Sequence, residues 1–249
     1  MLKYNKNLYN IELEKKILFD KIDKGEHTLE KGFRELFYMN CWDPAKRVPC
    51  LTVILFNSYT CFSGQVYNDT YTTSVFKKLV DENFGYMLTF YSGIALLAGG
   101  TLSILTVEKF GRLTVIYVSW VGQMIAMWAL AYAFYYDEIG VAICAQICYS
   151  FILYYGTTVT ILYCCEISQP FVVAIGIAFN WIFKSIIGEI LPMIYDNLPL
   201  YWLPLIMGLS GAILFIVCRP LFVETKGKTF DKIEKEYAGF KYKFWHSHT

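Results

Sequence analysis

Ionisable side chains stand at three places where apolar sequence is interrupted. One is a short turn that contains Glu108, Lys109 and Arg112. The other two are Glu166 and Glu224, near the ends of later apolar runs. A glutamate and two cations cannot lie in hydrocarbon, so the turn must lie at a water interface. We refer to these five residues together as the charge lock.

Polar side chains inside the apolar runs form a second candidate site. Asn180, Lys184 and Gly188 share one face of a helix at four-residue spacing. Inside hydrocarbon each polar group must find a partner or line a cavity. This face is therefore predicted to form a cavity wall, and simple hydrogen bonding between helices is the alternative.

The composition is typical of polytopic membrane proteins. Hydrophobic residues make up 56% of the 249 residues, charged residues make up 17%, and the mean hydropathy is +0.39, well beyond an ordinary soluble domain. The net charge of +1 gives no indication of a nucleic-acid partner. The eight cysteines are interpreted as small hydrophobes, so no metal or cofactor is expected. No apolar run holds a His/Asp/Glu cluster, which argues against an enzyme.

Six apolar runs are each long enough to cross a bilayer, which needs roughly 20 residues per helix. They comprise residues 48–67, 86–106, 114–136, 139–164, 171–195 and 200–223. The predicted fold class is an all-α integral membrane protein with six transmembrane helices. We expect three regions, a polar arm at residues 1–47, the six-helix part at 48–223 and a tail at 224–249.

The distribution of cations predicts the orientation in the membrane. Nineteen of the 22 lysines and arginines lie in the arm, in the Glu108 turn, or at and beyond the last apolar run. Lys77 and Lys78 lie in another connection, and Lys184 lies within a run. Cytoplasmic loops carry the excess of lysine and arginine. Both termini and the charge lock are therefore expected in the cytoplasm.

Two charged segments resemble motifs of one transporter family. Residues 107–113, Val-Glu-Lys-Phe-Gly-Arg-Leu, are similar to the acidic-basic-x-Gly-Arg-Arg turn between the eighth and ninth helices of sugar porters in the major facilitator superfamily. Residues 223–228, Val-Glu-Thr-Lys-Gly-Lys, resemble the Pro-Glu-Thr-Lys-Gly sequence after the twelfth helix. Glu166 matches the glutamate closing the tenth helix, and Asn180 with Trp181 matches an Asn-Trp pair of the eleventh.

The resemblance implies that residues 48–236 form the C-terminal half of a major-facilitator bundle, with the arm corresponding to the central cytoplasmic loop. It also implies transport of a sugar or similar polyol by alternating access between two six-helix halves. In the family the cations of this turn bind glutamates at cytoplasmic helix ends, so the resemblance implies that Arg112 and Lys109 pair with Glu166 and Glu224, with Glu108 nearby. Arginine suits such multidentate pairing. The charge lock would then hold these helix ends together while the pathway is closed inside, and ordinary interfacial charges are the alternative. The residues expected to line the substrate pathway are Thr60, Gln65, Asn180, Trp181 and Lys184.

Two departures accompany this resemblance. The family's paired glutamines of the seventh helix fall at Thr60 and Cys61, and Leu113 stands where a second arginine is usual. No acidic residue clearly occupies a proton-relay position, so uniport is favoured over proton coupling.

The length of the chain leaves two functions open. A transporter would need a second six-helix half, either another copy or another protein, unless the chain is a truncated part of a longer product. The other expected partners are the lipid bilayer and a small polar substrate such as a sugar, and the plasma membrane is the expected location. The alternative function is a non-transporting membrane sensor or remnant.

Overall fold

Helices make up the secondary structure of the computed structural model, which describes residues 47–230 and 232–237. No strand occurs within these ranges. The predicted arm, apart from Arg47, and residues 238–249 of the predicted tail lie outside the described residues. The all-α class is therefore confirmed, and the division into arm, transmembrane part and tail stays a prediction.

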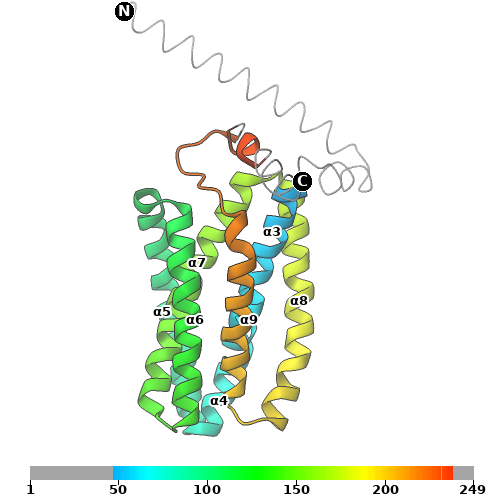
Figure 1. Ribbon diagram of the computed structural model, residues 1–249. Coiled ribbons are helices and arrows are strands. Elements are labelled where there is room, and N and C mark those ends of the chain that lie inside the picture. Colours follow the sequence, from blue (N-terminus) through cyan, green and yellow to red (C-terminus); the bar gives the residue numbers. More distant parts are fainter. Residues whose placement is uncertain (1–46, 231, 238–249) are drawn as a thin grey trace, which may run out of the picture. The chain divides into compact units, whose positions relative to one another are not determined.

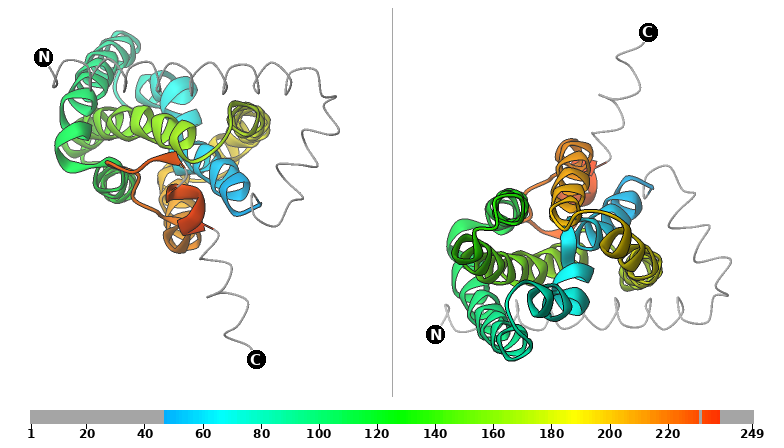
Figure 2. Two further views of the ribbon diagram at one scale, coloured as in Figure 1. Left: turned by 90° about the horizontal axis from the view of Figure 1, so that it is seen from above. Right: turned by 90° about the horizontal axis from the view of Figure 1, so that it is seen from below.

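Five helices are long and apolar enough to cross a membrane. They are α5 (Glu82–Phe110), α6 (Arg112–Tyr135), α7 (Ile139–Ile167), α8 (Pro170–Asn197) and α9 (Trp202–Cys218). The last of these reaches the required length together with the 3-10 turn η4 (Arg219–Leu221) that follows it. They run side by side in Figures 1 and 2, and each overlaps one of the predicted apolar runs. The chain is therefore a multi-pass membrane protein.

Local chemistry sets where these helices begin and end. Gly111 separates α5 from α6 with a φ of 92°, a conformation that glycine adopts without the steric penalty of a Cβ atom. Pro170 begins α8, where its fixed φ and missing N–H are tolerated. α5 extends four residues beyond the predicted run at each end, because a helix does not stop where its side chains become polar.

The first predicted crossing, residues 48–67, is a broken helix. α3 (Arg47–Thr60) is followed by two π-helical turns, η2 (Cys61–Gln65) and η3 (Tyr67–Tyr71), and then by α4 (Thr72–Leu79). Gly64 within η2 has a φ of 109°, which ends the regular α-helical path. The predicted count of six membrane-spanning helices is therefore not confirmed. Hydropathy sums side-chain transfer free energies, so it carries no information about a backbone break.

Buried hydrogen bonds fix this break against α6 and α7. Ser63 Oγ donates to Gln123 Oε1 at 2.8 Å, and Gln123 Nε2 donates to Ser119 Oγ at 2.9 Å. The Tyr149 hydroxyl donates to the Ser63 carbonyl at 3.0 Å. All four side chains are buried, and hydrogen bonds are electrostatically stronger there than in water. The break is therefore held by specific contacts with two neighbouring helices.

A close backbone approach between α5 and α7 provides a test of this packing. A Cβ atom at Gly99 would collide with the backbone carbonyl of Phe151. We expect Gly99→Val to destabilise the protein by about 1–3 kcal/mol, the usual cost of overpacking. The measurement is the midpoint of thermal unfolding of the detergent-solubilised protein. Gly93→Val on the same helix is the matched control, because a Cβ atom there meets nothing within 4 Å, and equal losses would contradict the packing.

Candidate functional site

The α5–α6 turn brings the charge lock together at one end of the helices. Gly111 ends α5, and Arg112 is the first residue of α6. A Cβ atom at Gly111 would lie 3.2 Å from Glu224 Oε2, which is tighter than ordinary van der Waals contact. Glycine therefore serves two purposes here, since it permits the positive φ and leaves room for the carboxylate of Glu224.

Arg112 pairs with Glu166 across 54 residues of sequence. Its Nε donates to Glu166 Oε1 at 3.0 Å and to Oε2 at 3.2 Å, and its Nη2 donates to Oε1 at 2.9 Å. The side chains are 14% and 25% exposed, respectively. Glu108, one turn earlier on α5, lies 3.5 Å from Arg112 Nη2 and is 75% exposed. The fork of the guanidinium thus joins the start of α6 to the end of α7.

Glu224 is held by backbone donors. The N–H groups of Arg112 and Leu113 donate to its carboxylate at 3.3 and 3.2 Å. The N–H groups of Thr225 and Lys226 donate to its Oε1 at 3.1 and 3.0 Å. A carboxylate at a helix N-terminus accepts otherwise unpaired N–H groups and complements the helix dipole. Glu224 therefore fastens the chain after α9 to the beginning of α6.

Lys109 takes part through its backbone. Its carbonyl accepts a hydrogen bond from Lys226 Nζ at 2.8 Å, and its own ammonium group lies 5.6 Å from the centre of the Phe110 ring. Among the described residues, Lys109 forms no ion pair with Glu166 or Glu224. Of the two cations in the turn, Arg112 is the one that pairs with a glutamate.

Three residues around the charge lock were missed by sequence reasoning. Thr225 Oγ1 donates to Glu166 Oε2 at 2.5 Å. The Tyr163 hydroxyl donates to the Val223 carbonyl at 2.9 Å and lies 3.1 Å from the Tyr237 hydroxyl. Burial raises the pKa of the Tyr237 phenol well above its usual value. These contacts hold the segment that carries Glu224, so the described part of the tail belongs to the site.

A weak signal for this docking was present in the sequence. Ile233 and Tyr237 stand four residues apart, which places them on one helix face. Both are buried, at 3% and 1% exposure. Two apolar residues four positions apart also occur on solvent-exposed helices, so the contact of Tyr237 with α7 could not be inferred from this spacing.

The pathway residues divide into a buried and an exposed group. Asn180 Nδ2 donates to Thr60 Oγ1 at 3.0 Å and to the Asn57 carbonyl at 2.5 Å. Gln65 is the last residue of η2, directly after Gly64, and is buried. It lies near the side chains of Asp69 and Tyr154. Asn180 and Thr60 therefore form a hydrogen bond between α8 and the broken segment. Such hydrogen bonding between helices is the alternative to a cavity wall that the sequence left open.

Trp181 and Lys184 make up the more exposed group. Trp181 is 64% exposed, and Lys184 is half-buried. The Lys184 Nζ atom lies 5.1 Å from the centre of the Trp181 ring. Gly188, on the same helix, accepts a hydrogen bond on its carbonyl from the Tyr71 hydroxyl at 3.0 Å. The helix face predicted from four-residue spacing therefore lies partly against the broken segment and partly open.

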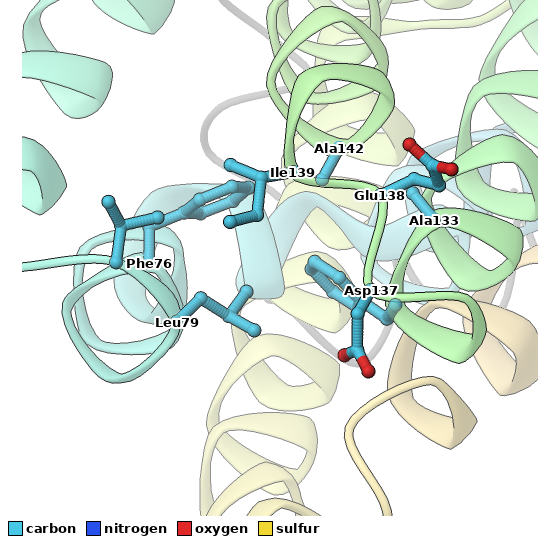
Figure 3. A pocket seen from close by; sticks show the side chains of 9 residues that line it. Phe76, Leu79, Ala133, Asp137, Glu138, Ile139 and Ala142 are labelled. Atoms are coloured by element: carbon cyan, nitrogen blue, oxygen red, sulfur yellow. The ribbon is translucent and has the colours of Figure 1, made fainter.

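A separate cavity of about 240 Å³ lies between α4 and the turn from α6 to α7. Figure 3 shows Phe76, Leu79 and Ile139 around it, with Asp137 and Glu138 nearby. No residue of the charge lock or of the predicted pathway lines this cavity. We assign it no role in transport.

Comparison with known proteins defines the class of membrane protein. Residues 4–237 match the family described as "Sugar (and other) transporter". The match covers more than half of the chain, so the chain belongs to this family. The resemblance to major-facilitator sugar porters is confirmed.

Individual relatives point in the same direction. The chain is 29% identical over 184 residues to the D-xylose-proton symporter of Escherichia coli strain K12, covering 66% of this chain and 36% of that protein. A solved double-tryptophan mutant of XylE superposes with a TM-score of 0.68 at 24% identity, covering 76% of this chain and 43% of that one. The proton:xylose symporter XylE bound to 6-bromo-6-deoxy-D-glucose gives 0.65 at 25% identity, with 76% and 42% covered. The chain thus spans about a third of the curated relative that it matches.

Proposed function

We propose that this chain transports a sugar or a similar polyol by alternating access, as one half of a sugar porter. The observation that carries the proposal is the family match over residues 4–237. The described part supplies five crossings, and the broken segment from α3 to α4 would supply a sixth. In Figure 1 this segment runs from the charge-lock end of the helices toward the opposite end.

The second half of the transporter is part of this proposal. Alternating access requires two halves that move against each other around a central site. The relative from Escherichia coli extends well beyond the aligned region, since the alignment covers 36% of its length. A second six-helix half, from another copy or another polypeptide, would complete the pathway.

The charge lock supports a conformational role. Arg112 joins α6 to α7 through Glu166, and Glu224 joins α6 to the segment after α9. Contacts that form in one conformer and break in another bias the equilibrium between them. The lock would therefore stabilise the conformer that is closed on its own side. The proposed orientation puts that side, with both termini, in the cytoplasm, and the cation distribution supports it. The proposed location is the plasma membrane.

Uptake of a radiolabelled sugar tests the proposal. Cells that express the full chain are expected to take up D-xylose or a related sugar faster than cells with an empty vector. The mass of the purified particle in detergent is expected to correspond to a dimer or to a complex with a second membrane protein. A stable monomer together with unchanged uptake of every sugar tested would refute transport and favour the sensor or remnant.

A further inference from the structure

Lys184 places a positive charge near the middle of a membrane-spanning helix. α8 runs from Pro170 to Asn197, so Lys184 stands about 20 Å from either end at 1.5 Å per residue. The hydrocarbon core of a bilayer is roughly 30 Å thick. An ionisable side chain at that depth is costly and needs a partner of opposite charge or contact with water.

The described residues provide no carboxylate at ion-pair distance for this charge. No ion pair within 4.0 Å includes Lys184. Asp69 in η3 interacts with it electrostatically from farther away. Glu189 is five residues along the same helix, a spacing at which side chains do not face each other. Within residues 47–230 and 232–237, Lys184 therefore has no carboxylate partner at ion-pair distance.

The ammonium group of Lys184 lies on the side of α8 that faces the broken segment. α8 contacts both η2 and η3. Asn180 and Gly188, four residues before and after Lys184 on the same helix face, hydrogen-bond to Thr60 and Tyr71 of that segment. Figure 2 shows α8 at the edge of the group of helices, beside α3. The break thus provides the polar surroundings of Lys184, and Trp181 provides an exposed aromatic ring beside it.

We propose that Lys184 binds the carboxylate of an anionic sugar, so that the substrate class is a sugar acid with one negative charge. This inference rests on the proposed transport function. A neutral sugar would add no negative charge to the surroundings that the described residues give the ammonium group, whereas a carboxylate forms a charge-assisted hydrogen bond with it. One lysine offers a single compact charge, which matches a monoanion. A phosphate dianion would bring a second negative charge that Lys184 alone does not balance.

Competing uptake of charged and neutral sugars tests the assignment. Cells that express the full chain are given radiolabelled D-xylonate, D-xylose or xylose 5-phosphate. We expect D-xylonate to be taken up in preference to both others. Lys184→Gln should lower the ratio of D-xylonate to D-xylose uptake by about tenfold, as expected for loss of a charge-assisted bond, while Lys184→Arg should retain most of the preference.

Two further variants separate substrate binding from general charge effects. Lys78→Gln removes a lysine charge at an exposed position of α4, where Lys78 lies 3.9 Å from Asp196 at the end of α8. This variant should leave the ratio of D-xylonate to D-xylose uptake unchanged. Asp69→Asn removes the competing carboxylate and should raise the ratio. A fall in the ratio with Asp69→Asn would instead make Asp69 the partner of Lys184 and overturn the proposal.

The remaining outcomes distinguish this inference from the function on which it rests. Uptake of D-xylose without preference for D-xylonate would retain sugar transport and overturn the sugar-acid assignment. A preference for xylose 5-phosphate would also overturn it. Absence of uptake for all three compounds would overturn the transport proposal itself, and the sugar-acid assignment with it.

Discussion

Arg112→Leu is expected to reduce the stability of the protein by about 2 kcal/mol, because it leaves a partly buried carboxylate without its cation. Glu166 is 25% exposed and receives three hydrogen bonds from Arg112. After the substitution its remaining partner in the described region is Thr225. The measurement is the midpoint of thermal unfolding in detergent, together with sugar uptake by cells that express the variant.

The expected change in uptake follows from the role of the lock. Without Arg112, α6 and α7 lose the ion pair that joins them at this end, so the conformer closed there becomes less populated. Sugar uptake is therefore expected to fall. Arg112→Lys keeps the charge but loses the bidentate geometry of the guanidinium group. Its unfolding midpoint and its sugar uptake should therefore lie between those of the wild type and Arg112→Leu. The double variant Arg112→Glu with Glu166→Arg should recover part of the loss, since it restores opposite charges.

An exposed ion pair on the same side of the structure is the matched control. Lys228 lies 2.7 Å from Glu236, with side chains 30% and 44% exposed. Lys228→Leu should cost no more than about 1 kcal/mol, because water and salt screen such pairs. If Lys228→Leu destabilised the protein as much as Arg112→Leu, the special contribution of the Arg112–Glu166 pair would be disproved.

Gly64→Ala is expected to destabilise the protein strongly, because it combines backbone strain with a steric collision. Gly64 has a φ of 109°, and forcing an L side chain into left-handed backbone costs roughly 1–2 kcal/mol. Its Cβ atom would also collide with Met127 Cε and lie 3.0 Å from the Tyr149 hydroxyl. Overpacking adds about 1–3 kcal/mol. The expected result is a large loss of folded, monodisperse protein, measured by size-exclusion chromatography in detergent.

A second substitution separates the two contributions at Gly64. Met127→Ala in the Gly64→Ala background makes room for the new methyl group, although it creates a cavity of its own. It should therefore relieve the loss of stability that comes from the collision. The loss that comes from the left-handed backbone should remain. Gly140→Ala in α7 is the control, because a Cβ atom there meets nothing within 4 Å and alanine is favourable in a helix. Normal yield from Gly64→Ala would show that the backbone break is not required for folding.

Much of the fold follows from local properties of the chain. The runs at 86–106, 114–136, 139–164, 171–195 and 200–223 each predicted a helix that the structure contains. This success has a simple reason, since hydrocarbon requires each crossing to satisfy its own backbone hydrogen bonds within a helix. The glycine turn between α5 and α6 was also recognisable, because its charges interrupt two apolar runs.

The candidate site was predictable only in part. The sequence identified Arg112, Glu166 and Glu224 as members of one charged cluster, because the segments that carry them resemble motifs of one transporter family. It did not distinguish the side-chain pairing of Arg112 with Glu166 from the backbone binding of Glu224. The choice depends on where the chain after α9 meets the first N–H groups of α6, and that contact joins residues 112 positions apart.

The sequence by itself determined that this is an α-helical membrane protein of the sugar-transporter family, because hydropathy and the charged motifs are properties of contiguous residues. Only the tertiary structure decided that the first predicted crossing breaks at Gly64, that Asn180 hydrogen-bonds α8 to Thr60, and that Tyr237 docks beside Tyr163. Each of these depends on which surfaces meet after the helices pack. Packing is set by side-chain shape and hydrogen bonding between distant segments, which no single stretch of sequence contains.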